Sequence, residues 1–130
     1  MTVKKTVVLV DDDNDVLTVL KKSLELNNYE VYDFDNPVKA LDYLKSVNSP
    51  LLLITDIRMP QMTGFELVRE VKRKHPKMSI IALTSFEINK SEFERLLPSS
   101  KIDALVNKPV SMNRFLDTVK AIMASKISEE

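Results

Sequence analysis

The sequence predicts a single α/β domain in which a parallel β-sheet carries helices on both faces. Short apolar runs, rich in valine and isoleucine, alternate along the chain with longer segments whose apolar residues recur at helical spacing. The chain has 130 residues, a length that suits one domain of ordinary size. Hydrophobic residues make up 44% and charged residues 29%, which is the balance of a globular domain and not of a disordered chain.

The first strand and the first helix lie near the start of the chain. Residues 6–10 (TVVLV) form a continuous β-branched run, which is typical of a strand buried on both faces. In residues 16–26, valine and leucine repeat at helical spacing, and Asp13 or Asn14 can cap the start of this helix.

A second strand and helix follow, and then a third strand. Residues 31–34 predict a strand, which is the weaker of the two so far. Pro37 suits the first turn of a helix that continues to Leu44. Residues 51–55 (LLLIT) predict the third strand, with Pro50 before it as a stop.

The second half of the chain continues the alternation. Residues 65–71 predict a helix, and residues 79–83 (SIIAL) predict the fourth strand. A short helix is expected over residues 91–97, a fifth strand over residues 102–106, and a last helix from near Ser111.

Strands joined by helices imply right-handed crossover connections, which leave few possible topologies. The simplest is a flavodoxin-like, doubly wound five-stranded parallel sheet in the order 2-1-3-4-5, with five helices. We expect this domain to span residues 1–125 and to be followed by a polar tail over residues 126–130. In such sheets the working crevice lies outside the carboxyl ends of the strands where their order reverses, here between the first and third strands.

The composition excludes several kinds of site. The chain has no cysteine, one histidine (His75) and one glycine (Gly64), so it lacks disulfides, thiolate or multi-histidine metal sites, and glycine-rich phosphate loops. The formal net charge is zero, which argues against direct nucleic-acid binding. No apolar run reaches the roughly 18 residues of a membrane helix, so we expect a cytoplasmic protein that does not enter a membrane.

Polar side chains follow four of the predicted strands. Because the carboxyl ends of parallel strands share one edge and adjacent strands lie ~4.8 Å apart, the acids after the first and third strands should converge. The residues expected at this edge are Asp11, Asp12, Asp56, Thr84, Ser85, Asn107, Lys108 and Pro109.

Three converging carboxylates need compensation. Two carboxylates ~5 Å apart repel each other by roughly 3 kcal/mol at an effective dielectric constant near 20. The available compensators for Asp11, Asp12 and Asp56 are Lys108 and a hard divalent cation, because oxygen-only ligation selects Mg²⁺, Mn²⁺ or Ca²⁺ over zinc. Residues 13–15 are expected instead to cap and charge the start of the first helix.

This pattern resembles the receiver domain of two-component response regulators, of the chemotaxis-regulator type, over essentially the whole chain. Each motif alone is weak, but all of them in order, at these separations, form a highly specific signal. The motifs are Val10-Asp11-Asp12, Asp56-Ile57-Arg58-Met59-Pro60, Gly64, Thr84-Ser85 and Lys108-Pro109.

The resemblance implies a phosphoacceptor. Asp56 would take a phosphoryl group from a phosphohistidine of a sensor histidine kinase or a phosphotransfer protein. Mg²⁺ (or Mn²⁺) would be the cofactor, held by Asp11, Asp12, Asp56 and the backbone carbonyl of Arg58.

The resemblance also implies roles for the ends of the last two strands. Thr84 and Lys108 would bind the phosphoryl oxygens, and the Lys108-Pro109 bond is expected to be cis, as is usual in the family. The domain would promote its own phosphorylation and dephosphorylation without being a classical enzyme.

The resemblance also implies that phosphorylation switches the conformation of the domain. The residues expected to switch or to modulate this change are Ser85, Phe86, Leu105 and Pro109. Many family members carry an aromatic residue three positions before the lysine, and here Leu105 stands there, so the aromatic relay is absent or replaced by aliphatic repacking. The bulk of Arg58 and Phe86 predicts that they slow hydrolysis of the phosphoaspartate. The downstream effector is unknown, and a dimer through the fourth helix, fifth strand and fifth helix is a further expectation.

Other classes of protein fit the residues less well. A haloacid-dehalogenase phosphatase needs a second acid two residues after its nucleophile, where this chain has Arg58. A flavodoxin-type electron carrier needs a hydroxyl- and glycine-rich loop after the first strand, where this chain has aspartates. The alternative that stays open is a receiver-like interaction module that docks partners without using phosphorylation. Leu105 favours it, because this residue stands where many family members carry the aromatic switch residue.

Overall fold

The computed structural model describes residues 5–48, 52–85, 91 and 102–128, with the backbone alone for residues 126–128. Five parallel strands form one sheet in the order β2-β1-β3-β4-β5, which confirms the predicted topology. The strands are β1 (Lys5–Val10), β2 (Tyr29–Phe34), β3 (Leu52–Asp56), β4 (Ser79–Thr84) and β5 (Ala104–Asn107).

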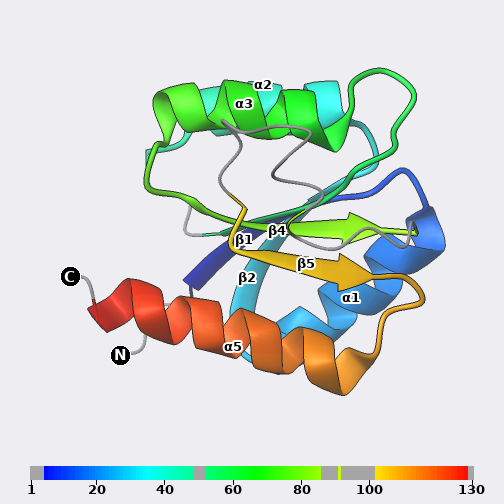
Figure 1. Ribbon diagram of the computed structural model, residues 1–130, viewed down its shortest axis with the longest axis vertical. Coiled ribbons are helices and arrows are strands. Elements are labelled where there is room, and N and C mark those ends of the chain that lie inside the picture. Colours follow the sequence, from blue (N-terminus) through cyan, green and yellow to red (C-terminus); the bar gives the residue numbers. More distant parts are fainter. Residues whose placement is uncertain (1–4, 49–51, 86–90, 92–101, 129–130) are drawn as a thin grey trace.

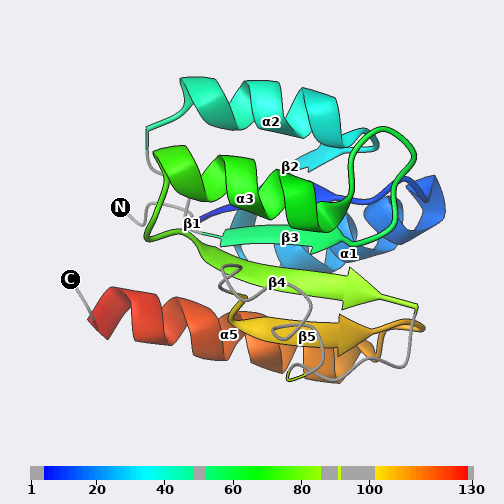
Figure 2. The ribbon, with the colours of Figure 1, turned by 45° about the horizontal axis from the view of Figure 1, so that its top comes forward.

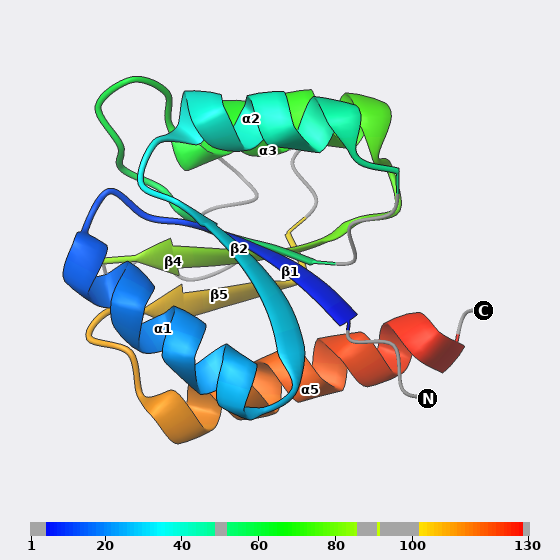
Figure 3. The same cartoon turned by 180° about the vertical axis from the view of Figure 1, so that it is seen from behind.

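Helices cover both faces of the sheet, so the domain has three layers (Figure 1). Figure 2 shows α2 and α3 on one face, and Figure 3 shows α1 and α5 on the other. Their bounds are α1 (Asn14–Leu26), α2 (Pro37–Ser46), α3 (Gly64–Lys74) and α5 (Met112–Ser128).

Two of the expected helices differ from their predicted bounds or lie largely outside the described residues. The helix expected over residues 91–97 lies outside the described residues except for Ser91, so the described part of the chain contains four of the five expected helices. The last helix, α5, continues to Ser128 and therefore takes in residues 126–128, which were expected to belong to a polar tail.

The core consists of two apolar layers, one on each face of the sheet. Successive residues of a strand point to opposite faces, so Leu53 packs beneath α2 and α3 whereas Ile54 packs against α1 and α5. Both side chains are completely buried, as a strand with a continuous apolar run requires. This burial fixes the register of the central strands, and it therefore also fixes the positions of the residues at their carboxyl ends.

The second strand begins two residues earlier than predicted. Asn28 has a φ of 73°, in the left-handed region that asparagine adopts more readily than most residues, and its N–H donates to the carbonyl of Glu25 (3.0 Å). This ends α1 abruptly and returns the chain to the sheet at Tyr29.

The fifth strand begins two residues later than predicted, at Ala104. Asp103 joins the neighbouring strand in an irregular way: its N–H donates to the carbonyl of Ile80 (2.8 Å), and its carboxylate accepts the Ile80 N–H (2.8 Å). A side chain thus occupies the place of a backbone acceptor, and regular pairing starts only after it.

His75, at the end of α3, contacts the neighbouring helix α2. Its ring Nε2 lies 2.7 Å from the carbonyl oxygen of Leu44, and the neighbouring Lys74 contacts the carbonyl of Lys45. The end of α3 therefore caps the last carbonyls of α2 and joins the two helices.

Candidate functional site

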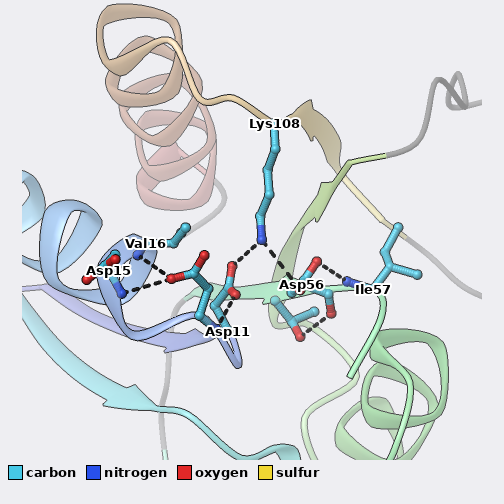
Figure 4. A network of polar contacts seen from close by, with 8 residues as sticks. Asp11, Asp15, Val16, Asp56, Ile57 and Lys108 are labelled. Carbon is cyan, nitrogen blue, oxygen red and sulfur yellow. Dashed lines mark hydrogen bonds and ion pairs between the residues drawn. The ribbon is translucent and has the colours of Figure 1, made fainter. Parts of the chain in front are cut away.

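Neighbouring strand ends deliver the polar side chains of the site to one edge of the sheet. Asp11 follows β1 directly, and Asp56 is the last residue of β3. Thr84 is the last residue of β4, and Lys108 follows the last residue of β5. The predicted convergence is therefore confirmed, and Figure 4 shows Asp11 and Asp56 on the same side of their strands, with Lys108 reaching down between them.

The acidic part of the site consists of Asp11, Asp12 and Asp56. One carboxylate oxygen of each lies within 4.8 Å of the others. Asp11 is completely buried and Asp56 is 7% exposed, whereas Asp12 is exposed at the rim. The cluster therefore reaches solvent through Asp12, while Asp11 and Asp56 lie behind it in the protein interior.

Lys108 supplies the positive charge. Its Nζ lies 2.7 Å from Asp11 Oδ2 and 3.5 Å from Asp56 Oδ2. Its backbone N–H donates to the carbonyl of Thr84 (2.7 Å), which ties the ends of β4 and β5 together. The Lys108-Pro109 peptide bond is cis, as expected.

Asp11 Oδ2 has an incomplete set of partners. It is buried, and the partner that the described residues give it is the Lys108 ammonium group at 2.7 Å. Its other oxygen, Oδ1, accepts the N–H of Asp13 (2.9 Å). The Lys108 ammonium offsets part of the negative charge, but three carboxylates meet here, so the donor set fits a hard divalent ion such as Mg²⁺ or Mn²⁺.

The surroundings of Asp56 and Lys108 shift the pKa values of both groups. Burial and the neighbouring charge of Asp11 raise the pKa of Asp56 from 3.8 to about 6, although Lys108 and the N–H of Ile57 act in the opposite direction. Burial alone would lower the pKa of Lys108, but its contacts with Asp11 and Asp56 outweigh burial and raise that pKa. The lysine is therefore firmly cationic, and the raised pKa of Asp56 makes its carboxylate easier to protonate than an ordinary aspartate.

The orientation of the Asp56 carboxylate is fixed by a backbone group that the sequence did not reveal. The N–H of Ile57 donates to Asp56 Oδ1 at 2.9 Å, and the same N–H lies 3.1 Å from the carbonyl oxygen of Leu83 on β4. Figure 4 shows this contact beside the ion pair that the other oxygen makes with Lys108. No side-chain pattern signals such a bond, because any residue at position 57 except proline would supply the N–H.

Gly64 lets the loop after β3 fold back against Asp56. Its N–H donates to the carbonyl of Ile57 (2.7 Å), and a Cβ atom at this position would lie 2.3 Å from the carbonyl oxygen of Asp56. Any side chain here would have to displace backbone. Thr63 caps the helix that starts at Gly64, because its Oγ1 accepts the N–H of Glu66 (3.1 Å).

The remaining predicted residues surround this centre. Arg58, Ser85 and Pro109 are exposed, and Leu105 on β5 is half-buried against the apolar cluster beneath α2 and α3. Phe86 lies outside the described residues. Asp13 belongs to the helix and not to the cluster, as expected, since its Oδ1 accepts the N–H groups of Asp15 (2.9 Å) and Val16 (3.3 Å).

Comparison with known sequences identifies the family. The sequence model of the response regulator receiver domain matches residues 7–120. This chain is a response regulator receiver domain. The resemblance of its motifs is thereby confirmed, and such receivers are signalling domains of two-component systems and not classical enzymes.

The receiver has relatives among regulators and within a kinase. It is 42% identical over 82 residues to the response regulator receiver protein CpdR of Brucella abortus, a match that covers 63% of this chain and 68% of that protein. It is 28% identical to the polar-differentiation response regulator DivK of Brucella anthropi, over 92% of this chain and 96% of that protein. The sensor kinase CckA of Brucella abortus is also 28% identical over 91% of this chain, but the match covers only 12% of that kinase.

Solved structures show the same receiver fold. A CheY-like response regulator receiver domain protein from Methanospirillum hungatei superimposes with a TM-score of 0.88 at 26% identity, over 98% of this chain and 100% of that one. A receiver domain protein from Clostridium thermocellum gives 0.85 at 24% identity, over 97% and 99% of the two chains, which speaks for the fold alone. None of the helices in the described part of the receiver has both the length and the apolar character that a bilayer crossing requires.

Proposed function

We propose that this receiver accepts a phosphoryl group on Asp56 in a Mg²⁺-dependent reaction, and that phosphorylation switches its binding to a partner. The observation that carries the proposal is the meeting of the carboxylates of Asp11, Asp12 and Asp56 with the ammonium group of Lys108. The acids can hold a cation, and the lysine can hold an anion. A site of both charges suits phosphoryl transfer, which needs positioning and charge neutralisation more than covalent assistance.

Asp56 is the nucleophile in this proposal. Its Oδ1 is held by the N–H of Ile57, which leaves Oδ2 to attack the phosphorus of a phosphohistidine. The bond that forms joins Oδ2 to phosphorus, and the bond that breaks joins phosphorus to the imidazole nitrogen of the donor, which keeps the electron pair. With a pKa of about 6, the carboxylate is mostly ionised at neutral pH and therefore competent to attack.

The cation would be Mg²⁺ or Mn²⁺, held by Asp11, Asp12, Asp56 and the carbonyl oxygen of Arg58. When bound, the ion neutralises charge on the phosphoryl oxygens. The excess of three carboxylates over the Lys108 ammonium group supports this ligand set, as does the absence of cysteine from the chain.

Thr84 and Lys108 hold the transferred group. The Lys108 ammonium already faces Asp56 Oδ2 at 3.5 Å, so it can pair with a phosphoryl oxygen attached there. The Thr84 hydroxyl donates to another phosphoryl oxygen. The backbone N–H of Lys108 donates to the carbonyl of Thr84, so the backbones that carry the two side chains are joined directly.

The switch is proposed to run through β5 by aliphatic repacking. Leu105 on β5 pairs with Ala82 on β4 in the sheet register. Ala82 lies two residues before Thr84 on β4. A shift of Thr84 toward the phosphoryl group therefore reaches the half-buried Leu105 directly, with Ser85 and Pro109 moving at the strand ends. Arg58 and Phe86 are proposed to hinder the water that hydrolyses the phosphoaspartate.

The donor is proposed to be a sensor histidine kinase or a phosphotransfer protein, and the reaction to take place in the cytoplasm. Membership of the receiver family and the likeness to part of the sensor kinase CckA support a donor of this kind. The output is proposed to be protein docking or dimerisation through β5 and α5, without direct contact to nucleic acid.

The decisive experiment is incubation with Mg²⁺ and acetyl phosphate, followed by mass spectrometry of the intact protein. The wild type should gain the mass of one phosphoryl group, and Asp56→Asn should not. Asp42→Asn, which changes an exposed acid on α2, is the matched control and should be phosphorylated normally. Omission of Mg²⁺ should abolish the gain.

A docking-only module is the second candidate, and Leu105, which stands in place of an aromatic switch residue, favours it. If no Asp56-dependent mass gain occurs with any phosphodonor, the phosphoacceptor proposal fails and the docking-only module remains. Binding to a partner would then be the same with and without acetyl phosphate.

A further inference from the structure

Thr55 is a buried hydroxyl in an otherwise apolar layer of the sheet. Its side chain is 1% exposed, and its neighbours in the register, Val10 and Ala82, both belong to the apolar cluster beneath α2 and α3. A valine would fill the same volume there, and a buried hydroxyl is tolerated only when it is hydrogen-bonded. The partner of the hydroxyl therefore indicates what Thr55 contributes.

That partner is the backbone of the phosphoacceptor itself. Thr55 Oγ1 donates to the carbonyl oxygen of Asp56 at 2.9 Å. This carbonyl is one end of the peptide unit between Asp56 and Ile57, and the N–H at the other end donates to Asp56 Oδ1 at 2.9 Å (Figure 4). Because a peptide unit is planar and rigid, fixing the carbonyl also fixes the direction of the N–H.

The direction of this N–H matters because it has two acceptors. Besides Asp56 Oδ1, the Ile57 N–H lies 3.1 Å from the carbonyl oxygen of Leu83 on β4. A small rotation of the peptide toward Leu83 would release the carboxylate oxygen. The carbonyl at the opposite end is held on one side by the Thr55 hydroxyl and is approached on another by Gly64, where even a Cβ atom would come within 2.3 Å.

We infer that Thr55 is a positioning residue for the phosphoacceptor: its hydroxyl orients the Asp56-Ile57 peptide so that the Ile57 N–H holds Oδ1 and Oδ2 is left facing Lys108. The inference rests on the proposed function of Asp56, because it assigns the two oxygens of that residue different tasks. Thr55 acts only through the peptide, so it should affect the rate of transfer and not the binding of the donor.

The first test compares Thr55→Val with the wild type in phosphorylation by acetyl phosphate at saturating Mg²⁺. The maximal rate should fall about tenfold, as expected when a reacting group is misplaced by a fraction of an ångström. The acetyl phosphate concentration that gives half the maximal rate should not change. Thr55→Ser, which keeps the hydroxyl, should restore the rate, and Thr6→Val in β1 is the control for replacing a strand threonine outside the site.

The second test needs no phosphodonor and no metal. Hydrogen exchange of the Ile57 amide, followed by NMR, should be about fivefold faster in Thr55→Val, as the loss of one hydrogen bond of ordinary net strength would produce. Thr55→Ser and Thr6→Val should exchange like the wild type. If the wild type accepts no phosphoryl group, the proposed function fails, whereas this exchange measurement still decides whether Thr55 orients the peptide.

The inference is overturned if Thr55→Val is phosphorylated as fast as the wild type, or if its Ile57 amide exchanges at the rate of the wild type. If thermal unfolding shows that valine disturbs the fold, Thr55→Ala and Thr55→Ser form a second pair in which only serine carries the hydroxyl. Slow transfer in the alanine variant with normal transfer in the serine variant supports the inference. Equal rates in the two variants overturn it.

Discussion

Lys108 lies closer to Asp11 than to Asp56: its Nζ is 2.7 Å from Asp11 Oδ2 and 3.5 Å from Asp56 Oδ2. The lysine therefore compensates first for the completely buried Asp11, and Asp56 is left with a pKa raised to about 6. The negative charge of the three carboxylates is therefore only partly balanced by Lys108.

Removing the ammonium group should destabilise the domain. Lys108→Met leaves two neighbouring carboxylates without a cation, and we expect the free energy of unfolding in urea at neutral pH to fall by about 2–3 kcal/mol in the absence of Mg²⁺. Lys21→Met is the control, since Lys21 makes a half-exposed ion pair with Asp33 at 3.1 Å and should contribute less than about 1 kcal/mol. Equal losses in the two variants would contradict the special position of Lys108.

Stability without divalent ions should depend on pH through Asp56. The pKa of Asp56 in the folded protein, about 6, lies above the ordinary value of 3.8, so the folded state holds the proton more tightly. The stabilising contribution is fully present below about pH 4 and is lost as the pH rises through about 6, a loss of about 3 kcal/mol.

Asp56→Asn makes this loss measurable. The asparagine does not titrate, so the difference in unfolding free energy between this variant and the wild type should grow by about 2–3 kcal/mol between about pH 4 and pH 7.5. Urea unfolding at a series of pH values provides the measurement. A difference that stays constant over this range would show that Asp56 has an ordinary pKa.

Mg²⁺ should stabilise the domain through Asp12, although Asp12 itself is exposed. At a concentration 100 times its dissociation constant, an ion that binds only the folded state adds about 2.7 kcal/mol. Asp12→Asn should abolish the Mg²⁺-dependent rise in melting temperature while changing the metal-free stability little.

Asp13, next to Asp12, is the control for the Mg²⁺ response. Asp13→Asn alters the cap of α1, whose carboxylate accepts two helix N–H groups, and should leave the Mg²⁺ response intact. The proposed ligand set would be wrong if Asp12→Asn kept the full response to Mg²⁺, or if Asp13→Asn lost it.

Gly64→Ala should be costly, although alanine is the better helix former. The added Cβ would lie 2.3 Å from the carbonyl oxygen of Asp56 and 2.9 Å from Ile57 Cα, so backbone must move. We expect a loss of about 1–3 kcal/mol in urea unfolding, with slower phosphorylation of Asp56. Asn14→Ala, at the exposed first position of α1, should change stability by no more than about 0.5 kcal/mol.

Much of the site could be predicted because it lies at strand ends. Apolar runs such as residues 6–10 and 79–83 identify central strands, and parallel pairing then forces Asp11, Asp56 and Thr84 to one edge. Lys108 follows by the same reasoning. No side-chain contact had to be known for this, because the sheet order alone brings the residues together.

The details that could not be predicted depend on backbone geometry. The sharing of the Ile57 N–H arises from the direction of one peptide unit, which no residue type reveals. Thr55 is visible as a polar residue in an apolar run, but its bond to the Asp56 carbonyl is not. The late start of β5 has a similar cause, since the Asp103 carboxylate takes a backbone acceptor's place. Periodicity does not show that the side chain of an aspartate accepts a backbone N–H of the neighbouring strand.

The ends of β1, β3 and β5 bring the charged groups of the site to one edge of the sheet, whereas the outward faces of the four described helices carry none of them. Substitutions on those outer faces can therefore accumulate without moving the reactive carboxylate or the lysine. Natural variation can alter which proteins such a domain recognises while its chemistry stays the same, and a protein engineer could redirect its partners by redesigning helix surfaces alone.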